Sequence, residues 1–215
     1  MSSIYVHHRV TCEPRTWSDV AKQVIDLHDF VIRNNETSLY GLWRSQIGLP
    51  RDTITMISGW PDLEAAKEKS NKICIGMEMV SAVETCIMRP TIRPKTNKRP
   101  RRQGNYAFRW FDTPLRNLDE FLKLCFEAWP DFESSYDSQI IGLWKIENND
   151  KTVKTLLLTR RPNLAMWERS KIPEGPKETS VREKLSRRYD LCDWTTVYTT
   201  TLLTASDDVD LVRWS

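Results

Sequence analysis

Three histidines are the candidates for proton transfer near neutral pH: His7, His8 and His28. His7 and His8 are adjacent in a β-rich run, so their side chains point to opposite faces of a strand and one of them faces the interior. We expect His7 to act there as a general base or to hydrogen-bond a substrate, with a purely structural role as the alternative. His28 falls on the apolar face of a predicted helix, where a hydrogen-bonded core histidine is the more common role.

Aromatic side chains are the second group that could do chemistry, because rings line pockets for flat ligands. A ligand pocket of this kind would draw on the following residues: Tyr5, Trp43, Trp60, Tyr106 and Trp110. Arg44 and Arg109 lie among apolar neighbours, and a guanidinium there could bind a carboxylate or phenolate through two parallel hydrogen bonds. The alternatives are that the rings belong to the core and that each arginine pairs with an acid at a sheet edge.

Several catalytic classes have no signature in this sequence. Only seven glycines occur, and the glycine-rich motifs of dinucleotide and P-loop phosphate sites are absent. The serine-hydrolase and zinc-protease motifs are absent as well. The five cysteines are scattered without a C-x-x-C pair or a Cys/His cluster, so we expect no disulfide framework and no metal site. We also expect no cofactor. The N-terminus does not look like a signal peptide and no apolar run reaches the ~20 residues of a membrane span, so we expect a cytoplasmic protein.

An internal repeat is the strongest signal in the chain. The tetrapeptide Tyr-Gly-Leu-Trp at 40–43 recurs as Ile-Gly-Leu-Trp at 141–144, an offset of 101 residues. The same offset joins Tyr5 to Tyr106. One offset shared by separated positions predicts a tandem duplication of a unit of roughly 100 residues.

Each unit shows the pattern β-α-β-β-α-β. The expected elements are β-rich runs at 4–10 and 106–111, helices at 17–31 and 118–129, hairpins at 39–60 and 139–160 with turns at 48–52 and 148–151, helix starts at 62 and 163, and last strands at 78–88 and 194–204. The second helix should begin near 112–114, where a capping residue precedes a proline. The hairpin strands are apolar on both faces. The helices of a unit can cover only one face of its sheet, so the other face must be buried against something else.

We therefore predict an α+β fold in which two tandem ferredoxin-like units pack sheet to sheet as a pseudo-dimeric α+β barrel. The expected boundaries are 1–88 for the first unit, 89–103 for a basic proline-rich linker, and 104–215 for the second unit. The second unit carries an insertion at about 173–188, part of which has helical character.

The formal charge of +3 conceals an uneven distribution. Seven basic residues, no acid and three prolines fall within 89–102, whereas each unit has a formal charge of −2. Basic runs can bind nucleic acid, but this one has no aromatic residue for stacking and its neighbours are mildly acidic. We expect a solvated, semi-rigid connector and no nucleic-acid partner.

The region around the first hairpin resembles the NIPSNAP family. The resemblance rests on a strand with Gly-x-Trp at 41–43, the turn at 47–49, a second strand that ends in an aromatic residue at 60, and a helix start at 62–66; 141–144 and 162–165 repeat it. It implies the dimeric α+β barrel superfamily, in which ferredoxin-like units pair through their sheets, and it implies no particular reaction. Relatives in that superfamily include haem-binding enzymes, haem-degrading monooxygenases and cofactor-free monooxygenases that act on polycyclic aromatics.

Our first hypothesis is a NIPSNAP-like tandem α+β barrel protein that binds a small aromatic or amphipathic molecule in its barrel, with a cofactor-independent, monooxygenase-like reaction on it. The alternative is a non-enzymatic interaction protein or scaffold, so whether the chain is an enzyme stays open. Haem binding or degradation is a third hypothesis. It is weakened because the superfamily's haem enzymes use a proximal histidine, often in the second unit, which has none here. A homo-oligomer is compatible with all three.

Overall fold

A computed structural model describes residues 4–32, 38–74, 76–146 and 151–207, apart from the side chains of 28–32. The role predicted for His28 and most of the turn predicted at 148–151 therefore lie outside the described residues. The first half contains β1 (Ile4–Cys12), α1 (Trp17–Ile32), β2 (Ser38–Ile47), β3 (Thr53–Trp60), α2 (Leu63–Lys69) and β4 (Val80–Pro90). The second contains β5 (Asn105–Pro114), α3 (Leu118–Ser135), β6 (Gln139–Ile146), β7 (Thr152–Arg161), α4 (Leu164–Arg169), α5 (Pro176–Asp190) and β8 (Trp194–Leu202).

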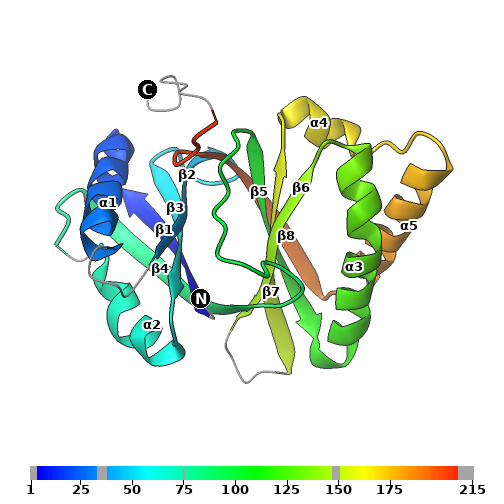
Figure 1. Cartoon of the computed structure of the whole chain (residues 1–215), viewed down its shortest axis with the longest axis horizontal. Coiled ribbons are helices and arrows are strands. Elements are labelled where there is room, and N and C mark those ends of the chain that lie inside the picture. The colour runs from blue at the N-terminus through cyan, green and yellow to red at the C-terminus, as the bar shows by residue number, and fades with distance from the viewer. Residues whose placement is uncertain (1–3, 33–37, 75, 147–150, 208–215) are drawn as a thin grey trace.

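The strands of the two halves form one closed barrel in the described part of the chain. Their order is β1-β3-β2-β8-β5-β7-β6-β4, and every neighbouring pair is antiparallel. The last strand of each half pairs across to the other half, β4 with β6 and β8 with β2. The helices α1 and α2 cover one outer flank, and α3, α4 and α5 cover the other (Figure 1). The predicted α+β fold of two ferredoxin-like units packed sheet to sheet is confirmed.

Aromatic rings fill the space between the two sheets, which explains why the hairpin strands are apolar on both faces. Trp43 and Trp144 are fully buried there, and each lies under the glycine two residues earlier. A Cβ added to Gly41 would come within 2.4 Å of the Trp43 ring, and one added to Gly142 within 2.3 Å of the Trp144 ring. The repeated Gly-x-Trp pattern thus reflects the same close contact between a tryptophan ring and the glycine backbone in both halves.

The short helices begin where the sequence predicts, because a side chain caps each of them. The Asp62 carboxylate accepts a hydrogen bond from Ala65 N at 2.8 Å, and the side-chain oxygen Oδ1 of Asn163 accepts one from Met166 N at 2.9 Å. The predicted start of the long second-half helix at 112–114 was wrong. Strand β5 runs on to Pro114, since those residues still pair with β7, and α3 starts at Leu118.

The segment between the halves contacts the barrel along much of its length. Strand β4 extends to Pro90, and Thr91 N then donates to Leu143 O at 2.9 Å. The Arg93 guanidinium binds the Glu133 carboxylate of α3 through two hydrogen bonds of 2.7 and 3.2 Å. In the second half, helix α5 occupies most of the region expected to be an insertion. Among the described helices, none is both long and apolar enough to cross a membrane.

Candidate functional site

A cavity of about 220 Å³ lies in the second half, between the outer face of its sheet and the helices α3, α4 and α5. The sheet contributes Ala107, Arg109, Ile140, Leu157, Thr159 and Arg161. The helices and the turn after α4 contribute Trp129, Phe132, Trp167, Ser170, Lys171, Arg182, Leu185, Arg188 and Tyr189. The lining therefore combines aromatic rings with cationic side chains.

Strand alternation separates this cavity from the barrel interior. In the register of β5 and β7, Ala107 lies opposite Thr159 and Arg109 opposite Leu157, and these side chains point toward the helices. The neighbouring residue Phe108 points the other way, into the aromatic core of the barrel. One sheet thus presents apolar rings to the barrel core and arginines to the cavity.

Arg161 is buried at the cavity without an acidic partner in the described part of the chain. Its Nη1 donates to Thr159 Oγ1 at 3.0 Å, its guanidinium lies 5.2 Å from the centre of the Phe132 ring, and its buried Nε has no hydrogen-bond partner. Burial, followed by repulsion from Arg109, lowers the pKa of Arg161 to about 10. The guanidinium is still charged at neutral pH, and it lacks the carboxylate that a buried arginine usually has.

Arg188 and Arg109 are two more buried or half-buried cations of the cavity lining. Arg188 Nη1 donates to Cys125 Sγ at 3.6 Å, and its guanidinium lies 4.8 Å from the centre of the Phe111 ring. The Arg109 guanidinium lies 5.6 Å from the centre of the Tyr189 ring, and burial lowers the pKa of Arg109. Both are positioned by neutral groups, like Arg161.

The equivalent positions in the first half are buried and carry no guanidinium. Strand register places His8 where the second half has Arg109, and Trp60 where it has Arg161. His8 Nε2 lies 3.2 Å from Ser58 Oγ, and Trp60 Nε1 donates to the same oxygen at 2.8 Å. All three of these first-half side chains are buried. The fold therefore forms at these positions without arginines.

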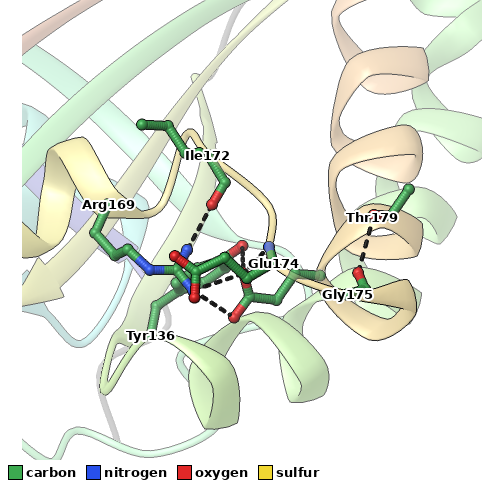
Figure 2. Close-up of polar contacts among 7 residues, drawn as sticks. Tyr136, Arg169, Ile172, Glu174, Gly175 and Thr179 are labelled. Carbon is green, nitrogen blue, oxygen red and sulfur yellow. Dashed lines mark hydrogen bonds and ion pairs between the residues drawn. The ribbon is translucent and has the colours of Figure 1, made fainter.

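A network of polar contacts holds the helices over the cavity. Figure 2 shows Arg169 and Tyr136 converging on the turn between α4 and α5. Arg169 Nη2 donates to both carboxylate oxygens of Glu178, at 3.0 and 2.9 Å, and the Tyr136 hydroxyl donates to Glu178 Oε2 at 3.2 Å. Glu174 N donates to the same oxygen at 2.7 Å. These bonds tie the start of α5 to the ends of α3 and α4.

His7, the predicted base, faces the barrel interior. Its Nε2 lies 2.9 Å from the Tyr198 hydroxyl, and its ring packs edge-on against Trp110 at 5.1 Å between ring centres. Burial, and then the charges of Arg9 and His8, lower the pKa of His7 to about 3, so the ring is neutral at pH 7. The sheet separates it from the cavity, and its catalytic role stays a prediction.

The structure brings only one of the seven predicted ligand-binding residues, Arg109, to the cavity. Four others lie together in the barrel core: Tyr5, Trp43, Tyr106 and Trp110. Trp60 packs on the outer face of the first sheet. The Arg44 guanidinium stacks 4.2 Å from the centre of the Trp17 ring and borders an open cleft of about 880 Å³. A ligand role for these six residues stays a prediction.

Comparison with known proteins identifies the architecture. No protein-family model matches the chain, and no curated protein matches its sequence. Among solved structures, a putative monooxygenase from Lactobacillus acidophilus NCFM has a TM-score of 0.60 at 11% identity, covering 98% of this chain and 100% of that one. An anthrone oxidase-like protein has 0.58 at 10% identity, covering 97% and 99%. A mutant chlorite dismutase from Candidatus Nitrospira defluvii has 0.62 at 8% identity, covering 94% and 92%.

This chain has the dimeric α+β barrel fold. Both halves of the barrel are supplied by a single polypeptide. At identities of 8–11%, the similarity to these structures shows the fold alone. The candidate site of this α+β barrel is therefore inferred from the residues of this chain.

Haem, which the superfamily resemblance brings into consideration, does not fit the lining of this cavity. The cavity lining that the structure describes includes no histidine, cysteine or methionine, the axial ligands most haem proteins use, and its tyrosine, Tyr189, packs its ring against the guanidiniums of Arg109 and Arg188. The second half has no histidine, and in the first half His7 and His8 are buried against Tyr198 and Ser58. Within the described ranges, no cluster of three or more His, Cys, Asp and Glu side chains could hold a metal ion.

Sequence reasoning missed Arg161 and Arg188. Arg161 follows another arginine at a strand end, and Arg188 ends a run of charged residues, so both look solvent-exposed. The signal that could have found Arg161 is the 101-residue offset, which sets it against Trp60 just as it sets Arg109 against His8. An arginine at a position where the other half has a buried ring indicates that the two equivalent positions have different functions.

Proposed function

We propose that this α+β barrel protein binds a small aromatic or amphipathic molecule in the cavity between its second sheet and the helices α3, α4 and α5. The observation that carries the proposal is a cavity walled by four aromatic residues: Trp129, Phe132, Trp167 and Tyr189. Flat rings favour stacked or edge-on contact with a flat ligand. A volume of about 220 Å³ is below the ~300–1,000 Å³ of pockets for drug-sized molecules, so the ligand is smaller than those.

A cofactor-independent, monooxygenase-like reaction on the bound molecule is the catalytic form of this proposal. It is supported by the shared fold with one protein described as a putative monooxygenase and another described as anthrone oxidase-like. Such chemistry needs an electron-rich substrate that gives up a proton. The lining residues that the structure describes include no histidine and no carboxylate, so the proposal assigns proton removal to no side chain.

Tryptophan fluorescence tests the binding site. We expect anthrone and 2-naphthol to quench the protein's fluorescence saturably, and Trp167→Leu to weaken or abolish that binding. Trp194→Leu is the matched control, because Trp194 is 48% exposed on β8 and does not line the cavity. Equal binding by wild type and Trp167→Leu would place the ligand elsewhere. An oxygen electrode tests turnover: no oxygen uptake with a bound ligand removes the catalytic form and leaves the binding form.

An interaction protein is the second candidate, favoured by the way the basic segment is held. The Tyr5 hydroxyl donates to Asn97 Oδ1 at 3.2 Å, and the Tyr106 hydroxyl donates to Arg102 O. The segment borders an open groove of about 520 Å³ whose lining includes Lys95, Lys98, Arg99 and Arg101. An acidic protein surface is the matching partner. Binding of polyglutamate by wild type, lost in a Lys95→Gln/Lys98→Gln/Arg99→Gln variant, would favour this function; equal binding by both would count against it.

A further inference from the structure

The charge of the cavity is one-sided. Its lining includes five cationic side chains, Arg109, Arg161, Lys171, Arg182 and Arg188, and no carboxylate among the described residues. Two of the arginines are almost wholly buried, Arg161 at 7% exposure and Arg188 at 3%. Like charges gathered in a poorly solvated space repel one another, so this arrangement costs folding free energy when nothing neutralises it.

Neutral groups provide the contacts of the buried guanidiniums. Among the ion pairs of the described residues, none involves Arg109, Arg161 or Arg188. The Nε atoms of Arg161 and Arg188 are buried without a hydrogen-bond partner. A buried donor left unpaired is unfavourable, and a bound acceptor would relieve it.

The fold itself does not require these charges. The first half forms the same strands with His8 and Trp60 at the positions of Arg109 and Arg161. Both of these side chains lie within hydrogen-bond distance of Ser58 Oγ. The second half has buried guanidiniums beside a cavity at positions where the first half has a buried imidazole and a buried indole, and this difference belongs to what the second half binds. Destabilising charge is commonly retained at binding sites.

We infer that the ligand of the cavity is a small organic anion, an aromatic ring bearing a carboxylate, phenolate or enolate oxygen that Arg109, Arg161 and Arg188 receive. This inference rests on the proposed function and adds the chemical class of the ligand. The guanidinium fork matches a carboxylate through paired hydrogen bonds, and the rings of Trp129 and Trp167 supply the apolar walls. Inorganic anions share only the charge, so they bind more weakly.

Isothermal titration calorimetry with matched ligands tests the class. At pH 7.5 we expect 2-naphthoate to bind at least about tenfold more tightly than the neutral 2-acetylnaphthalene and than inorganic phosphate. Arg161→Gln removes the preference for naphthoate and leaves the affinity for the ketone. Arg187→Gln is the control, since Arg187 lies on the outer surface of α5, paired with Glu120, and it keeps the preference.

The outcomes distinguish a failure of the anionic ligand class from a failure of the proposed function. Equal affinity for naphthoate and the ketone overturns the anion class and leaves the proposed function standing. Tighter binding of phosphate than of naphthoate overturns the aromatic part of the class. No binding by any of the three overturns the proposed function together with the inference.

Thermal unfolding without ligand gives a readout that a merely structural arginine would not give. We expect Arg161→Met and Arg188→Met to keep or raise the Tm, by up to about 2–4 °C, because each removes an unpaired buried charge. Arg161→Lys keeps the buried charge, so we expect no rise in its Tm. A clear fall in Tm for both methionine variants, with the naphthoate preference intact, would show that the arginines serve the fold and would overturn the inference.

Discussion

Arg161 in β7 and Trp60 in β3 occupy the same place in the strand register of the two halves. Arg161 pairs with Asn105 at the start of β5, as Trp60 pairs with Ile4 at the start of β1. The Trp60 ring is buried and its indole N–H is satisfied, whereas Arg161 borders a cavity and keeps an unpaired Nε. The second half therefore has a cavity beside the position that a buried indole occupies in the first half.

Filling the cavity from this position should abolish binding. In Arg161→Trp the indole takes the place that Trp60 has in the first half, so we expect a folded protein whose affinity for 2-naphthoate falls by a factor of about 100 or more. Circular dichroism checks the fold and calorimetry checks the affinity. Trp60→Phe is the control and should bind as wild type does. Unchanged binding by Arg161→Trp would mean that the ligand lies elsewhere.

The Gly-x-Trp contact should be intolerant of a single methyl group. Gly142→Ala places a Cβ within 2.3 Å of the Trp144 ring, and we expect it to lower the free energy of unfolding by about 1–3 kcal/mol. Trp144→Leu removes the ring, so the double variant should cost less than the sum of the single changes. Urea unfolding measures all three variants. Strict additivity would show that the ring does not oppose the methyl group.

The barrel could be predicted because the sequence repeats a β-α-β-β-α-β order at one offset, and because hairpin strands that are apolar on both faces require a second sheet. The cavity could not be predicted in that way. Its arginines come from β5, β7 and α5, and only the packing of α5 against α3 brings Arg188 to the cavity that Arg161 lines. Trp43 and Trp110 have the residue type of a ligand pocket, but strand alternation turns them into the barrel core.

His7 should make the protein sensitive to acid. Its folded-state pKa of about 3 lies below the ~6.5 of an unfolded histidine, so the unfolded state binds a proton first and stability falls as pH drops from about 6.5 toward 3. Between pH 7.5 and 5.0 this one group accounts for a loss of about 2 kcal/mol. Urea unfolding at the two pH values should show a smaller loss for His7→Gln. Equal losses would mean that His7 is protonated alike in both states.

The contacts of Arg169 should control how firmly α5 covers the cavity. Arg169→Ala removes the bonds to Glu178 and to Ile172 O, and we expect amide exchange in α5 to speed up by on the order of tenfold, with weaker naphthoate binding. Exchange in β1 and β3 is the internal control and should not change. Unaltered exchange in α5 would show that its apolar contacts hold the helix without the network.

The position of the bound ligand tests the central claim most directly. A crystal structure with 6-bromo-2-naphthoate locates the bromine by its anomalous signal. We predict one bromine between the second sheet and α3–α5, with the carboxylate in hydrogen-bond reach of Arg109, Arg161 or Arg188. A ligand found in the barrel core around His7, or in the cleft beside Arg44, would contradict the account.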